Sequence, residues 1–307
     1  MANMVNSFHT PILLNVFNRP EETERVLSIL RVLKPGVLYV HCDGPRQGNL
    51  NDRESVKAVH RIIKDGIDWP CDLHLLLEDV NLGCGKGPAT AINWFFSDVE
   101  AGIILEDDCC PHPDFFLYCQ QLLNYYSDDD RIGIISGSFF EKPLVSDASY
   151  HFSSYAGIWG WATWRRVWTL FDFDFYCSDK DFIAHVYPFV RSRGATDYWL
   201  KILHTCIKDG PGRTYWDYQL HLSLLYANKI HIIPNHNLVM NIGFNERATH
   251  TFNRNSRFAN KSVYGILPLV HPKRVHVNHR RDNKVYAPPF LRRLGRKAKL
   301  FLKRFSK

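Results

Sequence analysis

The sequence predicts an α/β protein in which a mostly parallel sheet lies between two layers of helices. In the first two-fifths of the 307 residues, short apolar runs alternate with amphipathic segments, which is the order of parallel strands joined by crossover helices. With 45% hydrophobic and 22% charged residues, an ordinary globular core is expected. Three consecutive acids, residues 106–108, end one apolar run, and the carboxyl ends of strands are where open α/β sheets bind ligands.

The first two strands and their helices are predicted from apolar runs and helix-start signals. Residues 11–17 are expected to form a buried strand, and residues 18–22 then start a helix with a proline and two acids. A second strand is predicted over residues 37–40. Asn51 with Glu54 resembles a capping box for the helix that follows.

The next unit contains a glycine-rich loop at residues 83–87, between a strand over 73–77 and a helix over 92–99 that leads to a fourth strand over 102–105. The glycines would let backbone N–H groups approach phosphate, and Lys86 could serve the same ligand. The loop follows the third strand rather than the first, and its glycine spacing differs from that of a dinucleotide-binding loop. A phosphate-facing or structural turn is therefore favoured over an NAD or FAD site.

The second half is expected to be less regular and rich in aromatic helices. Residues 115–126 are predicted to be a helix and residues 132–136 a strand. Four further helices are predicted over residues 159–170, 182–191, 198–208 and 216–227. Two short strands close the half, over residues 229–233 and 238–242.

Cysteine usage and the N-terminal sequence favour a cytoplasmic protein. There are eight cysteines with no CxxC spacing, and a chain of this length does not need a disulfide framework, so a reduced setting is expected. Residues 1–16 contain no basic segment followed by a long apolar run. We therefore expect neither a signal peptide nor a transmembrane span.

The net charge of +7 is concentrated at one end of the chain. Residues 290–307 hold eight Lys or Arg residues and no acid, which leaves about −1 on the other 289 residues. Apolar residues recur there at three- and four-residue steps, which predicts a C-terminal basic amphipathic helix in a tail over residues 286–307, suited to an anionic membrane surface. The protein would then be peripheral on the inner face of the membrane. A solvated terminal helix is the plain alternative, and no nucleic-acid-binding motif accompanies the basic residues.

Polar residues collect where the predicted strands end. Arg19, Asp43, the loop 83–87 and the acids 106–108 each follow a strand, and the carboxyl ends of parallel strands share one edge of a sheet. Three adjacent carboxylates are costly without a cation, and hard oxygen ligands suit Mg²⁺ or Mn²⁺. A nucleotide along this edge would meet an arginine for phosphate, an acid for base or ribose, and a metal for diphosphate. The alternative is a set of unrelated solvated turns.

Short motifs along the chain carry a resemblance to a known family. The chain resembles GT-A-fold glycosyltransferases, above all the N-acetylglucosaminyltransferase I family with its bacterial and viral relatives. The motifs are short, but their order and spacing between about residue 10 and residue 255 make the match specific. They are Val16-Phe17-Asn18-Arg19-Pro20, Asp43-Gly44, Ile104-Leu105-Glu106-Asp107-Asp108, Pro113-Asp114-Phe115-Phe116, Gly157-Ile158-Trp159-Gly160-Trp161, Tyr215-Trp216-Asp217, Asn241-Ile242-Gly243-Phe244 and Ala248-Thr249-His250.

The resemblance implies a role for each of the main site residues. Arg19 would contact the donor, and Asp43 would recognise uracil. Asp108, the last acid of the family's DxD-type motif, would be the ligand of Mn²⁺ or Mg²⁺. Asp217 would be the catalytic base, and its position beside Trp216 at a helix start would desolvate it in part and raise its pKa. By position alone, Asp217 fits equally well as an N-cap or first-turn acid.

Further residues are expected around the donor and the acceptor. Glu106 and Asp107 would contact sugar and ribose hydroxyls, and His250, in the segment that closes over the donor, would bind diphosphate. Trp159 and Trp161 could stack on an acceptor sugar. At helical spacing such tryptophans are more often core residues, and a lone histidine is more often structural.

These features together predict a metal-dependent inverting glycosyltransferase that moves a sugar, most simply GlcNAc, from a UDP-sugar to a hydroxyl of a glycan or lipid-linked acceptor. One domain over residues 8–285 is expected, with a nucleotide-binding half over 8–150 and an acceptor and catalytic half over 151–285. Two alternatives stay open. A sugar-nucleotidyltransferase usually carries a Gly-rich loop with Arg and Lys directly after its first strand. The other alternative is a catalytically silent, membrane-associated protein that binds nucleotides or glycans.

Overall fold

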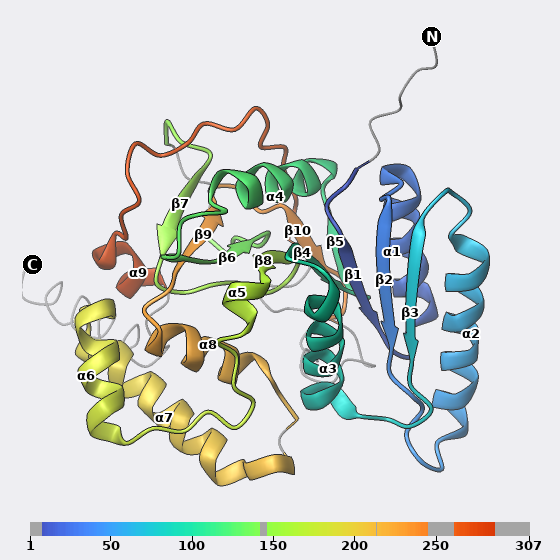
Figure 1. Cartoon of the computed structure of the whole chain (residues 1–307), viewed down its shortest axis with the longest axis horizontal. Helices are drawn as coiled ribbons and strands as arrows, with labels where there is room; N and C mark the ends of the chain where they lie inside the picture. The colour runs from blue at the N-terminus through green and yellow to red at the C-terminus, as the bar shows by residue number, and fades with distance from the viewer. Residues whose placement is uncertain (1–7, 142–145, 213, 245–260, 286–307) are drawn as a thin grey trace, which may run out of the picture.

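The computed structural model describes residues 8–141, 146–212, 214–244 and 261–285. In this part of the chain one eight-stranded sheet has the order β3-β2-β1-β4-β8-β6-β9-β7 (Figure 1). Strands β3, β2, β1 and β4 are parallel neighbours, as are β6 and β9, whereas β8 and β7 run antiparallel to the strands beside them. The predicted mostly parallel sheet is confirmed. Its strands are β1 (Ile12–Val16), β2 (Val37–Cys42), β3 (Asp72–Leu77), β4 (Ala101–Glu106), β6 (Ile132–Ser136), β7 (Tyr150–Ser153), β8 (Trp161–Trp164) and β9 (Ile230–Pro234).

The helices of the first half are α1 (Pro20–Leu33), α2 (Leu50–Gly66), α3 (Gly83–Asp98) and α4 (Pro113–Tyr125). Helix α1 begins at the expected proline. The predicted capping box at Asn51 is wrong, because the N-cap of α2 is Asn49, whose side chain accepts a hydrogen bond from Asp52 N at 3.0 Å. The glycine-rich segment 83–87 is not a separate loop, since α3 already begins at Gly83.

Strand β8 shows that the sheet lies between two helical layers. Trp161 and Trp164 are three residues apart in a strand and therefore point to opposite faces. Trp161 packs against Trp168 of α5 (Arg165–Trp168) and Trp216, with ring centroids 6.5 and 6.2 Å away, and Phe96 of α3 stacks on Trp168. On the other face, Trp164 Nε1 donates to the Leu123 carbonyl in α4. The three-layer α/β/α arrangement is thus confirmed.

The same strand corrects the helix predicted over residues 159–170. Residues 161–164 form β8, and only the following four form the short helix α5. All four β8 residues are buried, because the strand lies inside the sheet with helices on both faces. A strand of this kind shows no alternation of apolar and polar residues. The spacing of its tryptophans therefore resembles that of the apolar face of a helix.

A second, smaller hydrophobic core lies among α6 (Asp179–Val190), α7 (Arg193–Asp209) and α8 (Asp217–Tyr226). Figure 1 shows this helical group beside the sheet, at the end of the molecule away from α1 and α2. Phe182, Val186 and Leu203 are fully buried in it. The helices predicted over residues 182–191, 198–208 and 216–227 are confirmed as these three elements.

Two strands and one α-helix in the described part of the chain were not predicted, nor was the 3-10 turn η1 (Gly210–Gly212). Strand β5 (Cys109–Pro111) pairs antiparallel with β10 (Val239–Asn241) in a small sheet of its own, which places Asn241 opposite Cys109. The other two are β7 at the sheet edge and α9 (His279–Val285), where Asp282 Oδ2 accepts a hydrogen bond from Ser154 N at 2.7 Å.

Two predictions fall outside the described residues: the basic amphipathic helix of the tail over residues 286–307, and the donor contact of His250. Of the helices that the structure does describe, none combines the length and the hydropathy that a bilayer span requires.

Candidate active site

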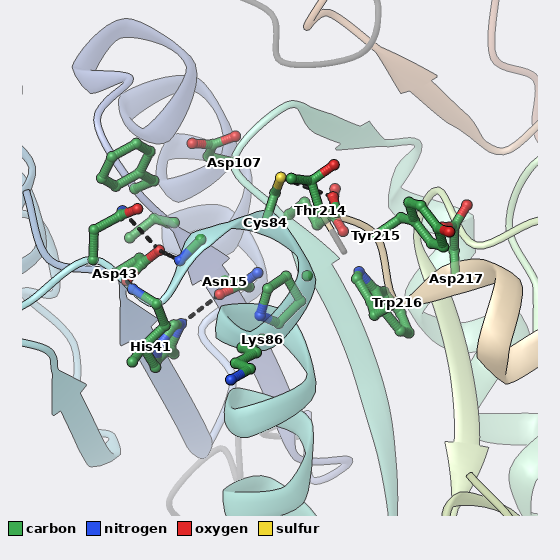
Figure 2. A pocket seen from close by; sticks show the side chains of 18 of the residues that line it. Asn15, His41, Asp43, Cys84, Lys86, Asp107, Thr214, Tyr215, Trp216 and Asp217 are labelled. Carbon is green, nitrogen blue, oxygen red and sulfur yellow. Dashed lines mark hydrogen bonds between the residues drawn. The ribbon is translucent and has the colours of Figure 1, made fainter. Parts of the chain in front are cut away.

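A cavity of about 900 Å³ opens at the carboxyl ends of β1, β2 and β4. We call its two sides the strand-end wall, formed by residues 17–19, 43 and 106–108, and the α8 wall, formed by residues 214–218. Figure 2 shows Asp43 and Asp107 on one side and Tyr215 and Asp217 on the other. The cavity brings together eight of the ten predicted site residues: Arg19, Asp43, Lys86, Glu106, Asp107, Asp108, Trp159 and Asp217.

Arg19 is fixed between two of the acids. Its Nη1 atom lies 3.2 Å from Asp107 Oδ1 and 2.9 Å from Asp108 Oδ2, and all three side chains are largely buried. Burial alone would lower the pKa of Arg19, but the charges of Asp107 and Asp108 outweigh it and raise that pKa above its ordinary value. The parallel pairing of β1 with β4 places Asn15 opposite Glu106, so the residues after both strands meet at this edge.

The three acids carry more negative charge than Arg19 neutralises. Burial raises the pKa of Glu106, and the charges of Asp108 and Asp107 raise it further. Burial also raises the pKa of Asp107, although Arg19 opposes this rise. Glu106 lines the cavity, and its carboxylate accepts no hydrogen bond from any residue that the structure describes. A further cation in the cavity would therefore stabilise the charged forms of these acids.

A divalent cation fits this chemistry only as a partner of a bound ligand. Within the described ranges, no three His, Cys, Asp or Glu side chains converge as a ready-made metal site. Mg²⁺ typically binds through one or two carboxylates together with waters and substrate phosphates, and Mn²⁺ favours the same oxygen ligands. The residues present therefore fit a metal that Asp108 holds jointly with a diphosphate.

Asp43 is occupied by the protein itself. Its Oδ1 accepts hydrogen bonds from Gly44 N (2.9 Å) and Leu82 N (2.7 Å), and its Oδ2 from Asn81 Nδ2 and Gly83 N (both 3.0 Å). A carboxylate has about four lone-pair sites, so none is left for a nucleobase. The expectation that Asp43 recognises uracil is corrected: the residue ties the start of α3 to the end of β2.

The start of α3 also reaches the opposite wall. Cys84 Sγ donates to the Thr214 carbonyl at 2.9 Å, which joins the strand-end side of the cavity to the segment before α8. Lys86 is exposed in the first turns of α3 and lines the cavity. Its expected contact with phosphate remains a prediction, and its position is compatible with that role.

Asp217 stands at the first position of α8, on the α8 wall. The residue before it, Trp216, is the N-cap of α8 and is buried against Trp161 and Trp168, with ring centroids 6.2 Å away in each case. The helix start is therefore anchored in the core while Asp217 lines the cavity (Figure 2). The Asp217 carboxylate accepts no hydrogen bond from the described residues, so it does not act as a side-chain cap.

The two tryptophans predicted to stack on an acceptor occupy different environments. Trp159 is half-buried and lines the cavity, where Phe140 and Phe244 pack edge-on against its ring at 5.0 and 5.6 Å. Trp161 is only 1% exposed and belongs to the core. Its predicted acceptor contact is therefore wrong, because no face of the ring reaches the cavity.

Sequence reasoning assigned no role to one residue that touches the acids, although the residue stands in one of the motifs. Asn241 Nδ2 donates to Asp108 Oδ1 at 3.1 Å, across 133 positions of the chain. The contact depends on the pairing of β10 with β5, which the motif at residues 241–244 does not reveal. On the α8 wall beside Asp217, Tyr215 was noted only as part of a motif, and Tyr218 was not singled out.

Comparisons with known proteins do not identify a family. No family model matches the sequence, and no curated protein matches it. Similar solved structures include HddC from Yersinia pseudotuberculosis, with TM-score 0.34 and 11% identity over 51% of this chain and 77% of that chain. A second is UDP-glucose pyrophosphorylase complexed with UDP-glucose, with TM-score 0.30 and 10% identity over 53% of this chain and 78% of that chain. A third is the apo form of a UDP-glucose pyrophosphorylase, with TM-score 0.34 and 10% identity over 73% of this chain and 90% of that chain. Likenesses of this size define neither a family nor an activity.

Proposed function

We propose that the protein is a metal-dependent, inverting glycosyltransferase that moves a sugar from a UDP-sugar to a hydroxyl of a glycan or lipid-linked acceptor. The main support is the distribution of charge in one cavity, with Arg19 and three acids on the strand-end wall and Asp217 on the α8 wall. A cavity of about 900 Å³ is in the size range of ligand sites that enclose most of a small molecule. UDP-GlcNAc is the donor that the family resemblance favours.

Residues of the strand-end wall bind and orient the donor in this proposal. Asp108 holds the divalent cation, and Arg19 and Lys86 direct positive charge at phosphate oxygens. The cation, when bound, stabilises the charge that develops on the leaving diphosphate. Glu106 accepts hydrogen bonds from hydroxyls of the donor sugar, which are the partners that the described protein residues do not supply. Asp107 stays paired with Arg19 and keeps it in place.

Asp217 acts as the general base from the α8 wall. It accepts the proton of the acceptor hydroxyl while that oxygen attacks C1 of the donor sugar. Trp159 offers a ring to the acceptor. Because the base and the leaving diphosphate lie on opposite sides of the sugar, the configuration at C1 is inverted.

A sugar-nucleotidyltransferase is the second candidate, and two of the similar structures are of UDP-glucose pyrophosphorylase. That reaction transfers the UMP group of UTP to a sugar 1-phosphate and releases pyrophosphate, so added pyrophosphate reverses it. The segment after β1 disfavours a nucleotidyltransferase. Only Phe17, Asn18 and Arg19 separate β1 from α1, and this segment contains no glycine-rich loop.

One assay separates the candidates. The purified protein is incubated with Mn²⁺ and each of several nucleotide-sugars, with and without pyrophosphate, and the nucleotides are separated by chromatography. A glycosyltransferase slowly hydrolyses its donor to UDP and free sugar without pyrophosphate. A nucleotidyltransferase instead forms UTP and sugar 1-phosphate, and only when pyrophosphate is present. If neither pair of products forms and the protein still binds UDP, it is a silent binding protein.

We extend the proposal to location: residues 290–307, with eight basic residues and no acid, hold the enzyme at an anionic membrane surface where lipid-linked acceptors reside. Removing these residues should abolish sedimentation with phosphatidylserine-containing vesicles at low salt and leave donor hydrolysis unchanged. Vesicle binding that survives the deletion would contradict this assignment.

A further inference from the structure

The surroundings of Asp108 bear on which metal the site accepts. We propose that Asn241, with Cys109, makes Asp108 a ligand through one oxygen only and thereby favours Mn²⁺ or Mg²⁺ over Ca²⁺. Asn241 is then a positioning residue, acting on the metal through Asp108. The inference rests on the proposed function, because it assumes a metal–diphosphate complex at this wall.

The first step concerns Asp108 Oδ1, which the protein already occupies. Asn241 Nδ2 donates to it at 3.1 Å, and Cys109 Sγ donates to it at 3.6 Å. One carboxylate oxygen offers about two lone-pair sites, so both are in use. Cys109 is fully buried, so its thiol stays beside Asp108 Oδ1.

The second step is that Asn241 cannot easily turn away. It is 3% exposed, its Oδ1 accepts a hydrogen bond from Gly243 N at 2.9 Å, and its strand pairs with β5 directly opposite Cys109. Ile242 N also donates to the main-chain carbonyl of Asp108 at 2.9 Å. The segment 241–243 is thus fastened to Asp108 at both its side chain and its backbone.

The third step concerns the oxygen that remains. Asp108 Oδ2 is held by Arg19 at 2.9 Å, beside a cavity in which Arg19 also lies. Gly243 approaches this oxygen so closely that any side chain there would clash with it. A cation that replaces Arg19 at Oδ2 meets a single oxygen, because Oδ1 stays with Asn241 and Cys109.

Single-oxygen coordination discriminates between cations. Mg²⁺ demands a compact octahedron and is commonly held by one or two carboxylates with waters and phosphates, and Mn²⁺ shares its preference for such oxygen ligands. Ca²⁺ is larger, takes 6–8 oxygens and often draws on both oxygens of a carboxylate. A carboxylate locked by partners on one side therefore suits the smaller ions better.

The test measures metal choice directly, without turnover. Mn²⁺ binding to the full-length protein in the presence of UDP is followed by the loss of the free Mn²⁺ EPR signal, and Ca²⁺ is then added as a competitor. In Asn241→Ala, Mn²⁺ affinity should fall about 10–100-fold, as for loss of other groups that orient metal ligands, and Ca²⁺ should compete better relative to Mn²⁺. Asn241→Asp keeps the size and the acceptor for Gly243 N but lacks the donor, and it should shift the preference toward Ca²⁺ further.

Asn237→Ala is the matched control. Asn237 is also buried just before β10, where it bonds Phe139 N and the Val239 carbonyl, each at 2.9 Å, rather than Asp108. It should keep the wild-type ratio of Ca²⁺ to Mn²⁺ affinity. The inference is overturned if both Asn241 variants fold, by circular dichroism, yet keep that ratio, or if Asn237→Ala changes it equally. Absence of Mn²⁺–UDP binding in the wild type would instead contradict the metal part of the proposed function.

Discussion

The two walls of the cavity are built on different principles. On the strand-end wall, Asp43, Asp107 and Asp108 are all held by hydrogen bonds or ion pairs from side chains or backbone. On the α8 wall, Asp217 accepts no hydrogen bond from the described residues and depends on the burial of Trp216 for its position. Glu106 aside, the acids of the first wall are held before a ligand arrives, whereas the second wall offers an acid that a ligand can engage.

This difference suits two successive tasks. Charges that are already held in place favour the binding of a metal and a diphosphate, because reorganising many charged groups during binding would cost free energy. The exchange of Arg19 for a cation at Asp108 Oδ2 is then a local change. Accepting a proton requires a carboxylate whose lone pairs are not taken by the protein. Three substitutions test whether the walls divide the work in this way, and a fourth tests the buried core.

The largest effect is expected from Asp217→Asn. Loss of the general base should lower kcat for donor hydrolysis and transfer about 10²–10⁴-fold, while Mn²⁺–UDP affinity stays at the wild-type value. Steady-state kinetics and UDP titration measure the two quantities. The control is Asp209→Asn, which removes the charge of a carboxylate that lies outside the cavity and accepts the Tyr215 hydroxyl bond. If Asp217→Asn kept a kcat close to that of the wild type, the general base would not lie on the α8 wall.

Asp108→Asn should affect the other wall. It removes the charged oxygen that faces Arg19 and the cation, so activity should fall on the order of 10²–10³-fold, and metal-dependent UDP binding should fall with it. Isothermal titration of UDP with and without Mn²⁺ reports the binding. If metal-dependent binding persisted in Asp108→Asn, the metal ligand would have to be another residue.

Asp43→Asn should weaken the scaffold more than the chemistry. The amide nitrogen would face two of the N–H donors that now bond the carboxylate, and buried donors without acceptors cost about 1–3 kcal/mol of unfolding free energy. Urea unfolding measures this loss, with Asp65→Asn on the exposed side of α2 as control. A variant of wild-type stability that no longer distinguishes UDP from GDP would restore Asp43 as a base-recognising residue.

The smallest effect concerns the core beneath the α8 wall. Burial, together with His221, lowers the pKa of His231 to about 3. On acidification the unfolded chain therefore binds a proton before the folded protein does. The contribution of His231 to the free energy of unfolding is complete above about pH 6.5 and is lost as pH falls toward 3, by at most about 1.4 kcal/mol per pH unit. His231→Gln should be less stable than wild type at pH 7.5 and should lose less on acidification to pH 5.5. An unchanged slope in chemical unfolding would show that His231 does not titrate in this window.

Local patterns predicted most of the strand-end wall. Residues 12–16 and 101–106 form buried strands, as their short apolar runs next to turn and acidic residues indicate. Parallel connectivity then brings Arg19 to the acids, even though 88 positions separate Arg19 from Asp107. The same reasoning wrongly placed the tryptophans of β8 in a helix, because a strand that is buried on both faces lacks the alternation of apolar and polar residues that identifies a strand.

The sequence by itself determined which residues stand at the strand ends, since strand formation and parallel order follow from local hydrophobic patterns and connection lengths. Only the tertiary structure decided which of those residues are left for a ligand. Asn81, Leu82 and Gly83 donate hydrogen bonds that occupy the Asp43 carboxylate. Asn241, which is 133 positions from Asp108 in the chain, donates a hydrogen bond to the Asp108 carboxylate. The physical reason is that a carboxylate's lone pairs go to whichever donors the folded chain brings near, and such long-range approaches leave no trace in local sequence.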